Sequence, residues 1–351
     1  MLRFRFAAVG MIDSLFFLVL RLRDSEFLAE RVHAADNEHG DSGADTIEGG
    51  YGADTLNGGT GIDTLSYHSS YGAVNVNLAT NTASGGDAEG DRISAFENVV
   101  GSAFDDVITG SSAANVLVGG AGNDRLDGGG GNDVFQIGLN SGADILIGGT
   151  GTDTVQFVDD NALLTLLSFS SVERFDATGK ANVTIAGTAE GDTLNFSAST
   201  LTNIAGIFGL EGDDVITGST GADILIGGAG ADRLNSGSGD DIFRYLGGNE
   251  GFDALNGGTG IDTIEAAAGG VVIGLNSIAG IETINGLGDT VIQGSALANV
   301  LNFSGTSLNG IAWIDGGDGN DTITGSSNND VIQGGNGADR LTGGLGYDYL
   351  T

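Results

Sequence analysis

The stretch GLEGDDVIT-GSTGADILI-GGAGADRLN-SGSGDDIFR, residues 209–244, contains four nine-residue units joined head to tail. Each unit follows the pattern G-G-x-G-x-D-x-U-x, in which U is a large aliphatic residue or Phe. The glycines permit the positive φ and close backbone approach of a tight turn. The D-x-U-x segment has the length of a short strand, in which successive side chains point to opposite faces. The stretch therefore predicts a regular alternation of turns and strands.

The same unit occurs about twenty times in the 351-residue chain. Runs of it occupy residues 40–66, 101–136, 139–156, 209–244, 248–265 and 316–351, and weaker copies lie at 187–195 and 285–302. Residues 187–219 also match 294–326 without a gap, which indicates duplication of a larger module. An acidic, glycine-rich linker would require neither a regular U position nor a regular Asp position.

One nine-residue unit cannot enclose a core, but two units can close a flattened coil of about eighteen residues, and such coils stack at the strand spacing of about 4.8 Å. The expected fold is all-β: a parallel β-roll or β-solenoid of stacked two-nonapeptide coils with intervening non-repeat β segments. The expected inward U residues are Ile47, Leu56, Leu65, Ile108, Leu117, Leu126, Phe135, Ile216, Leu225, Leu234, Phe243, Ile323, Ile332, Leu341 and Leu350.

Turns on one edge of such a stack are eighteen residues apart, so motif aspartates at i and i+18 should face each other. The chain supplies the pairs Asp45–Asp63, Asp106–Asp124, Asp214–Asp232, Asp223–Asp241, Asp321–Asp339 and Asp330–Asp348, and the less charged pair Asn115–Asp133. Calcium–oxygen bonds are about 2.4 Å long, so an ion could bridge two stacked turns. The candidate metal ligands are Asp45, Asp54, Asp63, Asp106, Asp124, Asp133, Asp144, Asp153, Asp214, Asp223, Asp232, Asp241, Asp253, Asp262, Asp321, Asp330, Asp339 and Asp348.

The charge of the chain supports a hard cation as ligand. The formal net charge is −35, from 47 acidic and 12 basic residues, which disfavours nucleic acid and anionic membrane surfaces as partners. Cysteine is absent, so disulfides and thiolate metal sites are excluded. The three histidines lie outside the glycine-rich units, and the oxygen-rich composition suits Ca²⁺. One alternative stays open: a solenoid whose aspartates make only turn hydrogen bonds.

The repeated unit resembles the RTX (repeats-in-toxin, hemolysin-type) calcium-binding nonapeptide repeat, which forms a parallel β-helix. The resemblance implies several bound Ca²⁺ ions, with turn carbonyl oxygens completing each shell, and it assigns that role to Gly119, Gly120, Gly122, Gly227, Gly228, Gly230, Gly334, Gly335 and Gly337. It also implies bacterial export through a type I secretion apparatus, an extracellular location, and folding when calcium binds outside the cell.

Four regions follow from the pattern. Residues 1–39 form a non-repeat segment, expected to be helical or disordered, and too poor in continuous apolar residues for a membrane span. Residues 40–156 hold the first arrays with a β connector at 67–100, 157–265 a connector and the second module, and 266–351 a connector and a third array that we expect to be truncated. The connectors should either continue the solenoid or form small flanking hairpins.

No catalytic motif occurs in the sequence: there is no H-E-x-x-H, no G-x-S-x-G and no phosphate loop followed by Lys. We therefore expect calcium binding rather than enzymatic activity from this chain. Two alternatives remain. The chain could be the export and folding module of a secreted protease, lipase or epimerase whose catalytic domain is missing, or it could be an adhesin or matrix spacer that contacts glycans.

Overall fold

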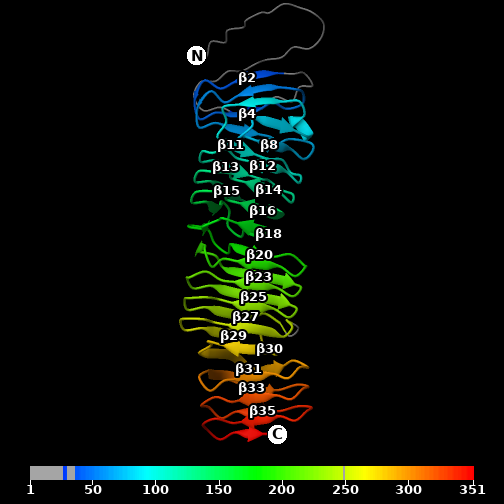
Figure 1. The fold of residues 1–351 in the computed structure, drawn as a ribbon, viewed down its shortest axis with the longest axis vertical. Helices are drawn as coiled ribbons and strands as arrows, with labels where there is room; N and C mark the ends of the chain where they lie inside the picture. Colours follow the sequence, from blue (N-terminus) through cyan, green and yellow to red (C-terminus); the bar gives the residue numbers. More distant parts are fainter. Residues whose placement is uncertain (1–26, 30–35, 248–249) are drawn as a thin grey trace, which may run out of the picture.

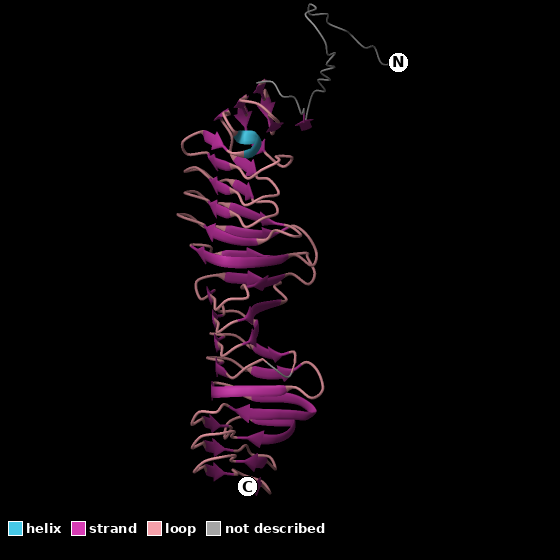
Figure 2. Ribbon diagram, turned by 90° about the vertical axis from the view of Figure 1, so that its right-hand side faces the viewer, coloured by secondary structure: helices cyan, strands magenta, loops and turns pink. Residues whose placement is uncertain are grey.

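The computed structural model describes residues 27–29, 36–247 and 250–351. These residues form a parallel β-solenoid of about 15 turns, so the predicted fold class is confirmed. The coils stack along one long axis from the first described strands to the carboxyl end, with the strands lying across that axis (Figure 1). The view turned by 90° shows the same stack of coils from the side, with turns projecting at its edges (Figure 2).

Strands of successive coils pair edge to edge and form long ladders along the axis. The first ladder comprises β1 (Phe27–Ala29), β4 (Thr46–Glu48), β7 (Thr64–Ser66), β11 (Asn98–Val100), β13 (Val116–Val118), β15 (Val134–Ile137), β17 (Thr154–Phe157), β19 (Arg174–Asp176) and β22 (Thr200–Thr202). The opposing ladder comprises β2 (Asn37–His39), β5 (Thr55–Asn57), β10 (Arg92–Ser94), β9 (Thr82–Ser84), β8 (Asn75–Asn77), β12 (Val107–Thr109), β14 (Arg125–Asp127), β16 (Ala143–Ile147) and β18 (Leu163–Ser170).

Two further ladders build the carboxyl-terminal half. One contains β20 (Thr184–Ala186), β23 (Gly206–Glu211), β25 (Ile224–Ala229), β27 (Ile242–Tyr245), β29 (Thr263–Ala266), β31 (Thr283–Gly294), β33 (Ser307–Asp315), β35 (Val331–Gln333) and β37 (Tyr349–Leu350). The other contains β21 (Thr193–Asn195), β24 (Val215–Thr217), β26 (Arg233–Asn235), β28 (Asp253–Asn256), β30 (Val272–Ala279), β32 (Val300–Asn302), β34 (Thr322–Thr324) and β36 (Arg340–Thr342). A small pair, β3 (Ser42–Gly43) and β6 (Thr60–Gly61), and one 3-10 turn at Gly86–Ala88 complete the structure.

The U residues form the core, as the repeat pattern predicts. Register pairs such as Ile108 with Leu126 place U residues of neighbouring coils side by side. Thirteen of the fifteen expected inward residues are buried, most of them with 0% exposure. The expectation is wrong for Leu350, which is 41% exposed, and Leu341 is only partly buried. Both lie in the last coil, which packs against a neighbouring coil on one side only.

The connectors use both of the expected arrangements. In residues 67–100, β8 and β9 form an antiparallel hairpin between β10 and β12. In the other two connectors the solenoid continues without interruption. The long strand β18 pairs with β16 at one end and with β20 at the other, and β31 likewise pairs with both β29 and β30. In residues 157–208 the ladder of β21 begins before the first ladder ends at β22, whereas in 266–315 both ladders continue and the β30–β31 pairing links them.

The expectation for the amino-terminal segment falls mainly on residues 1–26 and 30–35, which lie outside the described residues. Two described pieces of that segment are strands: β1 pairs with β4, and β2 pairs with β5. Among the described residues, no helix is long and apolar enough to cross a membrane.

Candidate metal centre

The motif aspartates link successive coils through their carboxylates. In each of the seven predicted pairs, the backbone N–H of the first residue donates to Oδ1 of the residue eighteen positions later, over 2.7–3.0 Å. The predicted i and i+18 stacking is thus confirmed. The contact joins a backbone amide to a carboxylate, and does not consist of two carboxylates facing each other. One oxygen of the later acid in each pair is therefore already used by an amide of the neighbouring coil.

The same contact continues where the coil is longer than eighteen residues. Asp124 donates its N–H to Oδ1 of Asp144 and Asp133 to Asp153, both twenty residues later. In the second module, Asp232 is bonded in the same way to Asp253, and Asp241 to Asp262, at a separation of twenty-one residues. The i+18 rule gave Asp144, Asp153, Asp253 and Asp262 no partners, but the stacking is preserved across coils that are two or three residues longer.

The second carboxylate oxygen, Oδ2, is left without a partner in most of these acids. Eleven of the eighteen predicted ligands have a buried Oδ2 with no hydrogen-bond partner in the part of the chain that the structure describes. They are Asp45, Asp54, Asp63, Asp124, Asp133, Asp153, Asp214, Asp232, Asp241, Asp262 and Asp321. A buried, unpaired carboxylate oxygen is costly in a folded protein unless a cation or a donor meets it.

Backbone carbonyl oxygens converge on the same points. A Cβ placed on Gly128 would lie 2.7 Å from the carbonyl oxygen of Gly148 and would overlap Oδ2 of Asp133. At Gly316, the Cβ would lie 2.7 Å from Oδ2 of Asp321 and would overlap the carbonyl oxygen of Gly334. We call each such contact between stacked turns a rung. Every rung brings a carboxylate oxygen together with a carbonyl oxygen of the next coil, in a space that only glycine leaves open.

The nine predicted glycine ligands occupy three equivalent turns. Gly119, Gly227 and Gly334 come first in their units and lie against Oδ2 of their own aspartate; Gly120, Gly122, Gly228, Gly230, Gly335 and Gly337 have positive φ and lie against backbone of the preceding coil. The carbonyl oxygens of Gly227 and Gly334 converge with the unpaired Oδ2 atoms of Asp214 and Asp321. Their coordination of calcium, and that of the other predicted residues, remains a prediction.

Burial shifts the ionisation of these acids. Desolvation raises the pKa of Asp124 to about 8, and the nearby carboxylates of Asp144 and Asp106 add to the shift. The same cause raises the pKa of Asp144 to about 7 and the pKa values of Asp133, Asp214 and Asp232 to about 6. A cation bound at Oδ2 would offset this cost, because an opposite charge favours the ionised form.

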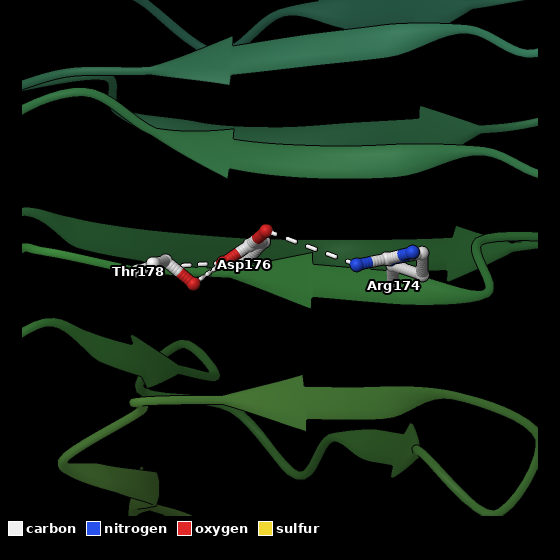
Figure 3. Close-up of polar contacts among 3 residues, drawn as sticks. All are labelled: Arg174, Asp176 and Thr178. Atoms are coloured by element: carbon white, nitrogen blue, oxygen red, sulfur yellow. Dashed lines mark hydrogen bonds and ion pairs between the residues drawn. The ribbon is translucent and has the colours of Figure 1, made fainter.

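Asp176, on β19, has a lowered pKa instead, because its carboxylate has hydrogen-bond donors and a positive charge beside it. Its Oδ1 accepts hydrogen bonds from the hydroxyl and N–H of Thr178, and Arg174 lies 3.9 Å from its Oδ2 (Figure 3). These bonds, followed by the positive charge of Arg174, lower the pKa of Asp176. The raised pKa values in the stacked turns therefore follow from burial and do not arise simply from the acidity of the chain.

In three predicted ligands, both carboxylate oxygens already have donors from a serine of the same unit. The units of Asp106, Asp223 and Asp330 begin with Gly-Ser, and the N–H and hydroxyl of that serine bind the carboxylate. A serine at the second position thus satisfies the aspartate four residues later. The sequence contained this signal, a Ser in place of the second Gly, but the repeat pattern treated the two residues as equivalent.

The remaining four predicted ligands have other surroundings. Oδ2 of Asp253 accepts a 2.6 Å hydrogen bond from the hydroxyl of buried Tyr245. Asp144 accepts the N–H of Asp124 through Oδ1, and Asp339 and Asp348, in the last coils, accept the amides of Asp321 and Asp330. These four acids therefore extend the stack, but Asp339 and Asp348, in the last coil, are less buried than Asp144 and Asp253.

The donor set fits a hard cation better than a transition metal. Within the described ranges, no group of three or more His, Cys, Asp or Glu side chains is arranged to hold a metal ion. A site in these turns must therefore combine carboxylate oxygens with backbone carbonyl oxygens, which is the coordination that calcium accepts. The unpaired Oδ2 atoms and converging carbonyls supply such oxygens. The residues present thus fit calcium.

Comparison with known protein families agrees with this chemistry. About half of the chain, in six stretches, matches the family model of the RTX calcium-binding nonapeptide repeat: residues 35–65, 100–135, 140–156, 208–243, 247–269 and 315–350. The matched stretches contain every motif aspartate discussed above and leave out most of the three connectors. Comparison with the curated proteins found no match to this chain.

Proposed function

Because this chain belongs to the RTX calcium-binding nonapeptide repeat family, we propose that it is an extracellular bacterial protein whose solenoid folds around several calcium ions. The proposal includes export in an unfolded state through a type I secretion apparatus. It gives the chain a structural role that depends on calcium and assigns it no catalytic step.

One observation carries the proposal: the row of buried Oδ2 atoms without partners, each beside a glycine turn. The coils cannot stack without burying these acids, because the N–H of each aspartate is bonded to the carboxylate of the next coil. Calcium at each rung would convert mutual repulsion into attraction between neighbouring coils. Bound metal then contributes directly to folding, since the unfolded chain does not hold its ligands together.

The proposed switch follows from the calcium concentration on the two sides of the cell envelope. With little free calcium, a net charge of −35 opposes compaction, and the chain remains open. Millimolar calcium fills the turns and stabilises the folded state by mass action, which is worth about 2.7 kcal/mol per site when the ion is at 100 times its Kd. Transport and folding are thereby separated in space.

Calorimetric titration of the full chain with calcium, followed in parallel by far-ultraviolet circular dichroism, tests the proposal. We expect several calcium equivalents per chain and a gain of β signal on binding. Magnesium at the same concentration is the control, since it requires a tighter octahedral shell and gives up its water reluctantly. Unchanged β content between calcium-stripped and calcium-saturated protein would contradict the proposal.

A further inference from the structure

Three short connector segments share one conformation. Ala95-Phe96-Glu97-Asn98-Val99, Ser171-Val172-Glu173-Arg174-Phe175 and Gly280-Ile281-Glu282-Thr283-Ile284 each begin with a residue at φ between 51° and 60°. The second and fifth residues of every segment are buried. The glutamates at the third position lie outside the stretches matched by the repeat family. The conformation therefore recurs three times beyond the recognised repeats.

Each of these glutamates takes the place of the next motif aspartate. The N–H groups of Asp63, Asp153 and Asp262 donate 2.8 Å hydrogen bonds to Oε2 of Glu97, Glu173 and Glu282. In return, each glutamate N–H donates to the carbonyl oxygen of the same aspartate over 3.1 Å. The acid stack therefore continues one coil further than the nonapeptides do.

The first residue of each segment also replaces a turn glycine. The carbonyl oxygen of Ala95 lies against Gly58, that of Ser171 against Gly148, and that of Gly280 against Gly257. The regular repeats place there the carbonyl oxygen of the first glycine of the unit one coil later. Oδ2 of the aspartate in the same unit lies beside the same glycine. In each segment the residue that supplies the carbonyl oxygen is two positions before the glutamate, whereas in a regular unit the first glycine is five positions before the aspartate. The longer side chain of glutamate compensates for this shorter spacing.

The aspartate at each of these places has a buried carboxylate oxygen without a partner. Asp63, Asp153 and Asp262 are each 0% exposed, and their Oδ2 atoms have no hydrogen-bond partner among the described residues. Glu173 and Glu282 also lie close enough to raise the pKa of Asp153 and Asp262 by charge repulsion, after the larger effect of desolvation. Each segment thus completes the same pair of oxygen types that the regular rungs present.

We propose that the three segments form additional calcium sites. In these sites Glu97, Glu173 and Glu282 follow Asp63, Asp153 and Asp262 as the next acids of the stack. The site of each pair takes a hard divalent cation between the glutamate carboxylate, Oδ2 of the aspartate and the carbonyl oxygen of the segment's first residue. This inference rests on the proposed calcium function. It extends calcium binding into connectors that the repeat pattern leaves outside.

Calcium calorimetry on glutamine variants tests the inference. The variants are Glu97→Gln, Glu173→Gln and Glu282→Gln, made singly and combined. The amide oxygen of Gln can still accept the aspartate N–H, so the hydrogen bond is kept while the charge is lost. We expect each substitution to remove about one calcium equivalent and the triple variant about three. Glu211→Gln, at an exposed glutamate of β23 outside the acid stack, is the matched control and should leave the stoichiometry unchanged.

The outcomes separate the two claims. Wild-type protein that binds no calcium overturns the proposed function and this inference together. Wild-type protein that binds calcium, with an unchanged stoichiometry in the triple variant, overturns the inference alone and leaves the glutamates as hydrogen-bond acceptors. If a variant does not fold, anomalous scattering from calcium-saturated wild-type crystals decides: a peak between Glu173 and Asp153 supports the site, and its absence overturns it.

Discussion

The backbone N–H of Asp214 donates a 2.9 Å hydrogen bond to Oδ1 of Asp232, while Oδ2 of Asp232 is buried without a partner. One carboxylate thus has two roles that different measurements can separate. Its first oxygen links two coils of the folded chain by a hydrogen bond that does not itself need a metal. Its second oxygen is destabilising until a cation binds, so the two oxygens make opposite contributions to the stability of the metal-free coil.

Replacement of Asp232 by Asn should weaken calcium binding without breaking the coil. The Asn side-chain oxygen can still accept the amide of Asp214, but the charge at the second position is lost. We expect at least a tenfold weaker apparent affinity at one site, about 1.4 kcal/mol. Asp223→Asn in the same array is the control, because Ser219 already satisfies both oxygens of Asp223. Equal effects of the two substitutions in calorimetry would refute this distinction.

Ser219→Gly should create a calcium site. The substitution removes the hydroxyl that binds Oδ1 of Asp223, and a glycine there can adopt the positive φ of Gly228, whose unit leaves Oδ2 of its aspartate, Asp232, unpaired although Ser219 N–H now binds Oδ2 of Asp223. The freed carboxylate then resembles those of the neighbouring units, so we expect about one more calcium equivalent per chain. Ser326→Gly should do the same for Asp330. A stoichiometry identical to that of the wild type in both variants would show that the serine does not control the site.

Metal-free protein should lose stability as the pH rises. Asp124, Asp144 and Asp253 have folded-state pKa values of about 8, 7 and 7, against 3.8 for the unfolded chain. Between these limits the folded state binds more protons, so stability is greatest at low pH and declines as the pH rises toward 8. Far-ultraviolet circular dichroism of calcium-stripped protein from pH 5 to pH 8 measures this as a loss of β signal while the chain opens. A β signal that grows as the pH rises would contradict it.

Calcium should reverse that dependence. Protons compete with calcium for the same carboxylate oxygens, so calcium-saturated protein is expected to be least stable in acid. Circular dichroism over the same pH range with calcium in excess provides the comparison. Parallel pH profiles with and without calcium would indicate that the ion binds elsewhere.

Gly120→Ala should destabilise the solenoid. The residue has φ of 112°, and an added Cβ would overlap the carbonyl oxygen of Ser102 in the neighbouring coil. A cost of about 1–3 kcal/mol is expected from the backbone conformation alone. Gly221→Ala is the control, since the nearest atom to its Cβ would be the Ser219 hydroxyl at 3.7 Å and its φ is not positive. Urea unfolding of both variants tests whether the difference exceeds about 0.5 kcal/mol.

The nonapeptide pattern predicted the fold because each unit carries its own turn and its own inward residue. Ile108 pairs with Leu126 and Asp106 with Asp124, as an eighteen-residue coil requires. The pattern did not predict the exchange of ladders in the connectors, because β18, which pairs with β16 and with β20, contains no glycine that would mark the change of partner. Coil lengths of twenty and twenty-one residues likewise depend on loops between arrays.

The candidate site was predictable at the level of residue type but not of occupancy. Asp124 and Asp223 have the same position in the repeat, yet only the first has an unpaired oxygen. The difference depends on the serine at the second position, whose N–H and hydroxyl both bind the carboxylate only in the folded turn. Glu173 was visible as part of a recurring segment, but its place after Asp153 depends on how the connector folds back onto the stack.

The most direct test of the account is anomalous scattering from crystals of the full chain grown in calcium. We predict peaks in the stacked turns, each between an unpaired Oδ2, such as that of Asp133, and the carbonyl oxygen of the next coil, such as that of Gly148. No peak is expected beside Asp106, Asp223 or Asp330. Crystals with ordered coils and no calcium in these turns, or with calcium only at exposed acids such as Asp105 and Asp213, would contradict the account.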